Sequence, residues 1–301
     1  MTTGVLVMAY GTPTTPEDVA AYYTRIRHGR PPTPELLEEL AGRYQQIGGT
    51  SPLAQRTADQ VAGIAAALEA RSPGAFDVRF GSKYEPPMIE DVAPSFAADG
   101  IDHVIGLVLA PHSSSMSTDQ YMSRARHSLG EHVTFTEIGA WWDAPGFLEL
   151  IARRVNDALA SVPAERHAST QVIFSAHSLP EKILAVGDNY PEQLRASAEG
   201  AARWAGVTNW DLAWQSAGRT ADPWIGPDIL EVLRTKKAQG FTDIVSCPIG
   251  FVSDHLEVLF DIDIQAQEVA DQLGLNLVRT ASLNADDDFI AVLADLVVAR
   301  A

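Results

Sequence analysis

The sequence predicts an α/β fold with two similar halves, each a parallel β-sheet flanked by helices. Short runs rich in β-branched residues alternate with longer segments whose apolar residues recur every three to four positions, as in helices. This alternation occurs twice along 301 residues, a length that favours two domains. Because strands that alternate with helices are typical of parallel sheets covered on both faces, we expect two such sheets.

Both halves supply strands and helices in the same order. Strands are predicted in the first half at residues 4–9, 76–81, 104–111 and 133–139. Its helices are predicted at residues 16–29, 33–47, 53–70 and 119–129. In the second half the predicted strands are residues 171–176, 210–216, 243–251 and 275–280. The helices that accompany them are predicted around residues 145–160, 191–205, 226–238, 254–272 and 286–300.

The halves also share a short motif. MAYGTP (8–13) and SAHSLP (175–180) each follow the first strand of their half and carry Ala, a ring and Pro at the same spacing. We therefore predict two Rossmann-like domains, 1–142 and 143–285, with a last helix at 286–301 that packs back on the first domain. Ligands of open α/β sheets bind beyond the carboxyl ends of the strands, which predicts an active-site cleft between the domains. The side chains expected to line this cleft are Tyr10, Lys83, His112, His177, Gln215 and Glu257.

Composition limits the ligands and the compartment. The net charge of −17 argues against a nucleic-acid partner, because phosphate binding requires clustered Lys and Arg. The single cysteine, Cys247, permits no internal disulfide and cannot hold an iron–sulfur cluster, and its apolar neighbours predict a buried thiol. The amino terminus lacks the pattern of a signal peptide, and no apolar run reaches transmembrane length. We expect a cytoplasmic protein without membrane insertion.

A histidine and a glutamate follow two predicted strands of the second half. His177 ends the run QVIFSAH, and Glu257 lies shortly after DIVSCPIGF. Taken alone, each has a structural explanation. A strand-terminal histidine is more often a hydrogen-bonded structural residue than a catalyst, and Asp254 with Glu257 fits a helix capping box. On that helix, His255 and Glu257 would point to different faces and share no metal.

The continuation of the same helix favours a functional role. Glu257, Asp261 and Gln265 recur every four residues and form a polar stripe, with Asp254 three residues before Glu257. Carboxylates near the amino end of a helix also gain from its dipole, so stability explains part of the pattern. The stripe would equally suit a hard divalent cation that moves inward from the surface.

One local group of Arg and Tyr residues is basic, although the chain as a whole is acidic. Arg27 lies near two tyrosines in YYTRIRHGR, and Arg43 precedes Tyr44. Guanidinium groups pair with carboxylates through two hydrogen bonds and stack on aromatic faces, so this group favours a flat, anionic, aromatic ligand. For Arg25 and Arg30 we favour a solvent-exposed helix end. The sequence contains no GxSxG, GxGxxG or GxxxxGKS/T motif, which argues against esterase, dinucleotide and P-loop chemistry.

Motifs spread over the chain resemble the ferrochelatases: LVMAYGTP, YYTRIRHGR, RYQQIGGTSPLAQ, VLAPHSSS, FSAHSLPEKI, WQSAGRTADPWIGPD and GFVSDHLEVLFD. They occur in register, and the combination of SAHSLP with DHLEVLFD is highly specific. A tyrosine at position 10 resembles the Gram-positive and actinobacterial branch of that family. The resemblance implies insertion of Fe2+ into coproporphyrin III in heme biosynthesis, with release of two pyrrole protons. A protoporphyrin IX ferrochelatase, a cobalt or nickel chelatase and a porphyrin or heme carrier are the alternatives.

The resemblance also implies roles for individual residues. His177 and Glu257 would bind metal and remove protons on one porphyrin face, with a neutral imidazole of ordinary pKa. Tyr10 would face the iron from the other side as its axial ligand. The macrocycle and its propionates would be held by Arg27, Arg43, Tyr44, Ser51, Lys83, Tyr121 and Ser216. The outer metal path would be formed by Asp254 and Asp261.

Fe2+ and coproporphyrin III would thus be substrates, with no permanently bound cofactor. A downstream heme-pathway enzyme that takes coproheme is the expected protein partner. The sequence departs from the family at His28, Tyr84 and Gln265, where an arginine, a histidine and an acid are expected. These departures affect one propionate contact and a peripheral metal site, not the reaction.

Overall fold

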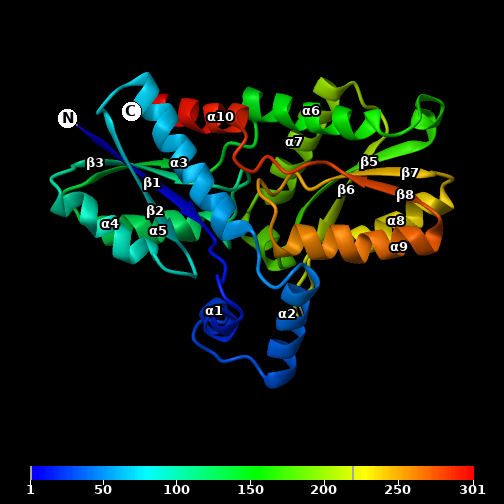
Figure 1. The fold of residues 1–301 in the computed structure, drawn as a ribbon, viewed down its shortest axis with the longest axis horizontal. Helices are drawn as coiled ribbons and strands as arrows, with labels where there is room; N and C mark the ends of the chain where they lie inside the picture. Colours follow the sequence, from blue (N-terminus) through cyan, green and yellow to red (C-terminus); the bar gives the residue numbers. More distant parts are fainter. Residues whose placement is uncertain (1, 219) are drawn as a thin grey trace.

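Two four-stranded sheets carry the fold of the computed structural model, which describes residues 2–218 and 220–301 (Figure 1). The first sheet has the order β2-β1-β3-β4, with β1 at Thr3–Ala9, β2 at Phe76–Ser82, β3 at His103–Val108 and β4 at Thr134–Ile138. The second has the order β6-β5-β7-β8, with β5 at Thr170–His177, β6 at Trp210–Gln215, β7 at Asp243–Cys247 and β8 at Asn276–Arg279. Neighbouring strands pair in parallel in both sheets, so the predicted α/β class with two similar sheets is confirmed.

Helices connect these strands and cover the sheets. The first half contains α1 (Val19–Ile26), α2 (Pro34–Gln46), α3 (Leu53–Arg71), α4 (Ile89–Ala98) and α5 (Thr118–Leu129). The second half contains α6 (Pro145–Ala160), α7 (Tyr190–Ala205), α8 (Ile229–Ala238), α9 (Gln267–Leu273) and α10 (Asp287–Val298). Helix α4 was not predicted; it contains Pro94, a residue that helix interiors ordinarily exclude. The α1–α2 segment projects from the body near the junction of the two sheets (Figure 1).

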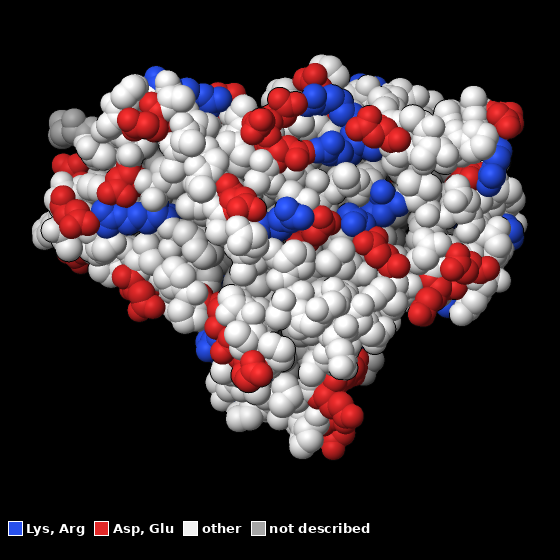
Figure 2. Space-filling model, in the orientation of Figure 1, with Lys and Arg blue, Asp and Glu red and all other residues white. Residues whose placement is uncertain are grey.

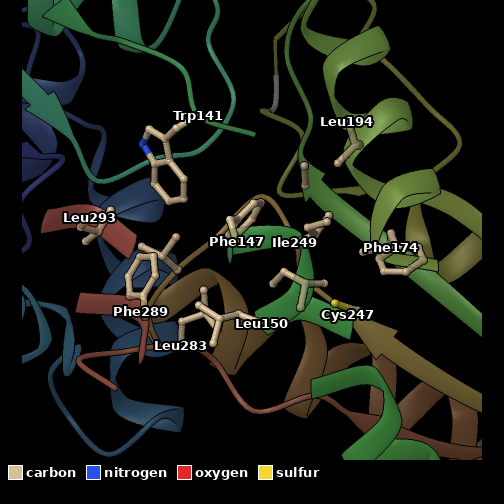
Figure 3. Packing of buried hydrophobic residues seen from close by; sticks show 14 of the residues in the cluster. Trp141, Phe147, Leu150, Phe174, Leu194, Cys247, Ile249, Leu283, Phe289 and Leu293 are labelled. Carbon is tan, nitrogen blue, oxygen red and sulfur yellow. The ribbon is translucent and has the colours of Figure 1, made fainter. Parts of the chain in front are cut away.

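The largest apolar core is continuous across the two halves. Val7 of β1 and Phe174 of β5 belong to the same buried cluster. Around Trp141, the rings of Phe147 from α6 and Phe289 from α10 lie 5.1 and 5.9 Å away between centroids (Figure 3). Helix α10 packs against both α3 and α6, so it contacts elements from each half. The domain boundaries given above stay a prediction.

Replacing Phe289 by alanine is expected to lower the free energy of unfolding by about 3–5 kcal/mol, because a buried ring is lost and a cavity remains. Phe289 is 0% exposed. Equilibrium unfolding in urea measures the change. Val298→Ala on the same helix is the control, since Val298 is 43% exposed and its truncation should cost less than about 0.5 kcal/mol. Equal losses for the two variants would show that Phe289 does not stabilise the core.

On the face shown in Figure 2, most Lys and Arg side chains lie beside acidic ones, and further acidic side chains stand without a basic neighbour. Ion pairs in the structure include Arg153–Asp288 at 2.7 Å and Arg279–Asp263 at 2.6 Å. Among the described residues on this face, no extended basic surface is visible. No helix in the described part of the chain is both long and apolar enough to span a bilayer.

Candidate active site

His177 is the last residue of β5, at the carboxyl end of the second sheet. Its Nδ1 is hydrogen-bonded to the Ser178 carbonyl oxygen. A carbonyl only accepts, so Nδ1 carries the hydrogen and Nε2 is left for other partners. The strand end is also fixed by its neighbours: the Tyr190 hydroxyl donates to the His177 carbonyl at 3.0 Å, and the Ser178 hydroxyl donates to the Ile225 carbonyl at 2.6 Å.

Glu257 approaches His177 from the segment that follows β7. His177 Nε2 and Glu257 Oε1 are 3.5 Å apart. The segment comes this close because residue 250 is glycine: a Cβ on Gly250 would lie 2.5 Å from the Ala176 Cβ. The Gln215 side-chain amide donates to the Glu257 carbonyl at 3.3 Å and ties this turn to the end of β6. The structure therefore brings the predicted imidazole and carboxylate together.

A second imidazole also lies beside Glu257. His255 Nε2 is 3.7 Å from Glu257 Oε2, and His255 Nδ1 donates to the Ser253 carbonyl at 2.9 Å. The expectation that His255 and Glu257 point to different faces of one helix is wrong, because His255 precedes the helical segment. Glu257 thus has an imidazole nitrogen near each carboxylate oxygen.

The helix after Glu257 differs from the predicted one. It is a π-helix, η4 (Val258–Ala266), whose hydrogen bonds run between residues i and i+5, and it continues into α9. Asp254 does not cap it, so the capping-box interpretation is wrong. Instead, the Asp254 carboxylate accepts hydrogen bonds at 3.1, 2.8 and 2.9 Å from Arg279, Ser282 and Asn284. The carboxylate oxygens of Asp254 therefore already accept hydrogen bonds, which disfavours Asp254 as a metal ligand on the predicted outer metal path.

Asp261 is the acid of that path that adjoins Glu257. It is buried on η4 and accepts a hydrogen bond from the Ser216 hydroxyl. Ser216 directly follows β6 and has a φ of 62°, a left-handed conformation that turns its side chain out of the strand. Burial and the nearby charge of Glu257 raise the pKa of Asp261 to about 6. Ser216 therefore holds an acid here, in addition to any predicted contact with the macrocycle.

The charges of His177 and Glu257 are strongly linked. Burial disfavours the His177 cation, but the charge and hydrogen bond of Glu257, together with the Ser178 carbonyl, more than offset it and raise the pKa of His177 to about 9. Burial also disfavours the Glu257 anion, yet the two neighbouring imidazoles keep the pKa of Glu257 well below its ordinary value. The expectation of a neutral imidazole with an ordinary pKa is therefore wrong. Near neutral pH the pair is an imidazolium and a carboxylate.

Tyr10 lies at the carboxyl end of the first sheet, directly after β1, and is 40% exposed. Its ring packs on Tyr84, with centroids 4.8 Å apart. Partial removal from water, with Tyr84 and the charge of Glu257 nearby, raises the pKa of Tyr10 well above its ordinary value. The phenol therefore keeps its proton near neutral pH.

Predicted macrocycle contacts come from α2, α5, the segments after α1 and α2, and the ends of β2 and β6. The Arg27 guanidinium lies 5.7 Å from the Tyr23 ring, and the Arg43 guanidinium lies 5.0 Å from the Phe260 ring of η4 while it donates to Glu39. Both arginines are half-buried. The predicted contacts that are buried are Tyr44, Ser51, Lys83 and Tyr121.

Two other side chains have structural partners that the sequence did not indicate. His112, predicted to line the cleft, is 3% exposed, and its Nε2 is hydrogen-bonded at 2.7 Å to the Ser197 hydroxyl of α7. It therefore links the two halves inside the protein. Arg25, interpreted as a solvent-exposed helix end, donates from Nε to the Tyr84 carbonyl at 2.6 Å and pairs with Glu85. Arg25 therefore holds α1 against the segment after β2.

Comparison with known proteins identifies the family. The ferrochelatase family model matches residues 2–301. The chain belongs to the ferrochelatase family. A coproporphyrin III ferrochelatase from Geobacillus sp. is 43% identical to this ferrochelatase over 302 residues, covering 99% of this chain and 97% of the relative. The coproporphyrin III ferrochelatase of Bacillus subtilis is 42% identical over 301 residues, with coverage of 99% and 97%. A ferrochelatase from Herpetosiphon aurantiacus is 43% identical over 301 residues and 99% of each chain.

Solved chelatase structures share the fold of this ferrochelatase. SirB from Bacillus subtilis with Fe3+ matches with a TM-score of 0.60 and 13% identity, covering 100% of this chain and 96% of SirB. CbiX, described as the terminal enzyme of siroheme biosynthesis in denitrifying bacteria, matches with a TM-score of 0.56, 13% identity and 99% coverage of each chain. At this low identity, the similarity establishes the two-domain α/β fold alone.

Proposed function

We propose that this ferrochelatase inserts Fe2+ into coproporphyrin III and gives Fe-coproporphyrin III in heme biosynthesis. The observation that carries the proposal is the 3.5 Å approach of His177 Nε2 to Glu257 Oε1 at the carboxyl end of β5. The choice of porphyrin is supported by relatives named coproporphyrin III ferrochelatase that are 42% and 43% identical over almost their whole length.

The charges of the site complement both substrates. Glu257 and Asp261 supply carboxylate oxygens, which hard divalent cations prefer. Arg27 and Arg43 supply guanidinium groups, which pair with the carboxylates of propionates through two hydrogen bonds. Coproporphyrin III carries more propionates than protoporphyrin IX, so it makes fuller use of such groups.

Cation binding and cation insertion are each accompanied by a proton transfer. In the free protein His177 is an imidazolium beside the Glu257 carboxylate. A divalent cation that binds this pair displaces the imidazole proton to solvent. When the cation moves on into the ring, one pyrrole proton restores the imidazolium and the other leaves through Glu257. Two protons are thus released for each Fe2+ inserted, and His177 and Glu257 return to their starting state.

The remaining parts of the proposal concern cofactor, compartment and partner. The reaction transfers a cation and protons, so it uses no permanently bound cofactor. Burial raises the pKa of the single cysteine, Cys247, to about 12, which favours a structural thiol over a metal ligand. We place the protein in the cytoplasm, where a downstream heme-pathway enzyme takes the product.

Anaerobic mixing with Fe2+ tests the function. The kcat/KM obtained from the loss of porphyrin fluorescence should be at least roughly tenfold higher with coproporphyrin III than with protoporphyrin IX. Faster loss with protoporphyrin IX would assign the protein to the other branch of the family. Binding of both porphyrins without fluorescence loss, in protein shown to be folded, would favour a carrier.

A further inference from the structure

Lys83 is a buried cation beside Tyr10. It directly follows β2 and is 3% exposed. Its Nζ lies 4.9, 5.1 and 6.0 Å from the ring centroids of Tyr121, Tyr84 and Tyr10. Among residues 2–218 and 220–301, no carboxylate forms an ion pair with this ammonium. Burial and the nearby Arg124 lower the pKa of Lys83 to about 8, so near neutral pH most of this ammonium stays charged between aromatic rings.

The Lys83 ammonium differs from the neighbouring cations because it has no acidic partner among the described residues. The neighbouring arginines have acidic partners: Arg25 pairs with Glu85, and Arg124 lies 3.5 Å from Glu90. A buried ammonium without a carboxylate is costly, and aromatic faces offset only part of the cost. A positive charge thus lies 6.0 Å from the centre of the Tyr10 ring, whereas the acids of the site, Glu257 and Asp261, come from the other half.

We propose that Lys83 is a specificity-determining residue that keeps free divalent cations away from Tyr10, so that Fe2+ reaches the porphyrin from the Glu257 side only. The inference rests on the proposed function. A free Fe2+ ion carries two positive charges and is repelled by the ammonium. Iron inside a doubly deprotonated porphyrin is neutralised by the ring nitrogens and is not repelled. Lys83 thus distinguishes free from inserted iron by net charge and leaves Tyr10 accessible to inserted iron.

Calorimetric titration of the porphyrin-free protein with Co2+ tests the inference without turnover, so it is independent of which porphyrin is the substrate. Glu257→Gln provides the background, because it weakens the main cation site. Adding Lys83→Met, which keeps the aliphatic stem, should strengthen Co2+ binding by at least about tenfold, since a unit charge close to Tyr10 is removed. A phenol that coordinates the cation releases its proton to solvent and binds as phenolate, so the gain should disappear when Tyr10→Phe is added.

Two controls isolate the charge. Lys83→Arg keeps it and should bind Co2+ like the Glu257→Gln background. Lys237→Met removes a positive charge from α8, where the ammonium donates to the Gly274 carbonyl at 3.2 Å, and should change nothing. If Lys83→Met fails to fold, as judged by thermal unfolding, Lys83→Gln replaces it. Unchanged Co2+ affinity in the Lys83 variant, or a gain that survives Tyr10→Phe, would overturn the inference.

Discussion

Replacing His177 by alanine should slow Fe2+ insertion by about 10²–10⁴-fold while porphyrin affinity stays within a few-fold of the wild type. The imidazole is the partner that lies 3.5 Å from Glu257 and the group that exchanges a proton for the cation. The predicted propionate contacts Arg27 and Arg43 lie directly after α1 and on α2, and they stay in place when His177 is truncated. Two measurements separate these effects: the rate of fluorescence loss at saturating porphyrin, and the dissociation constant for coproporphyrin III without metal.

His167→Ala is the matched control for the loss of an imidazole. His167 Nε2 is hydrogen-bonded to the carbonyls of Leu159 and Val162 at 3.1 and 2.9 Å, outside the site. This variant should keep wild-type turnover. If His177→Ala, with an unchanged thermal unfolding midpoint, kept more than about a tenth of the wild-type rate, the role assigned to the imidazole would be refuted.

The sequence located the ends of the strands well. Tyr10, His177 and Ser216 directly follow or end buried apolar runs, and parallel strands place such residues at the carboxyl edge of a sheet. The short apolar runs were therefore sufficient to place these side chains near the site. Their partners were harder to predict, because a residue such as Gly250 acts through a close contact with a neighbouring strand.

The conformation of the turn before η4 could not be predicted from the local sequence pattern. An α-helix from residue 254 would separate His255 from Glu257, but residues 253–255 are not helical. A distant side chain holds this turn: Asn284 accepts from the Asp254 amide at 3.0 Å and donates to its carboxylate at 2.9 Å. Contacts between residues thirty positions apart leave no periodic signal in the sequence. The position of His255 beside Glu257 therefore could not be predicted.

The protonation state of His177 also could not be predicted from the types of residue in the sequence. An isolated histidine has a pKa near 6.5, and burial alone would lower it. The opposite shift arises because the Glu257 carboxylate lies beside the ring, and electrostatic energies depend on that separation. A motif such as SAHSLP specifies the imidazole but not its distance from an acid on another segment.

This shift predicts how cation binding depends on pH. Affinity of the porphyrin-free protein for Co2+ should rise from about pH 6 to about pH 8, by up to roughly tenfold per unit. The pKa of His177 is raised to about 9, so throughout this range the cation must displace a proton, and the rise should level off near pH 9. Calorimetry in buffers of different ionisation enthalpy measures the affinity and the protons released, expected to be close to one per Co2+.

Glu257→Gln should remove this proton release. Without the carboxylate the main cause of the raised pKa is lost and burial remains, so the His177 imidazole is already neutral at pH values between about 7 and 8. Co2+ affinity at about pH 8 should fall at least about 100-fold, since even outer partners of metal ligands contribute 10–100-fold. Glu199→Gln is the control: this exposed acid bonds Arg203 at 3.0 Å on α7 and should leave both quantities unchanged. Release of one proton per Co2+ by Glu257→Gln would mean that Glu257 does not hold the imidazole in its protonated form.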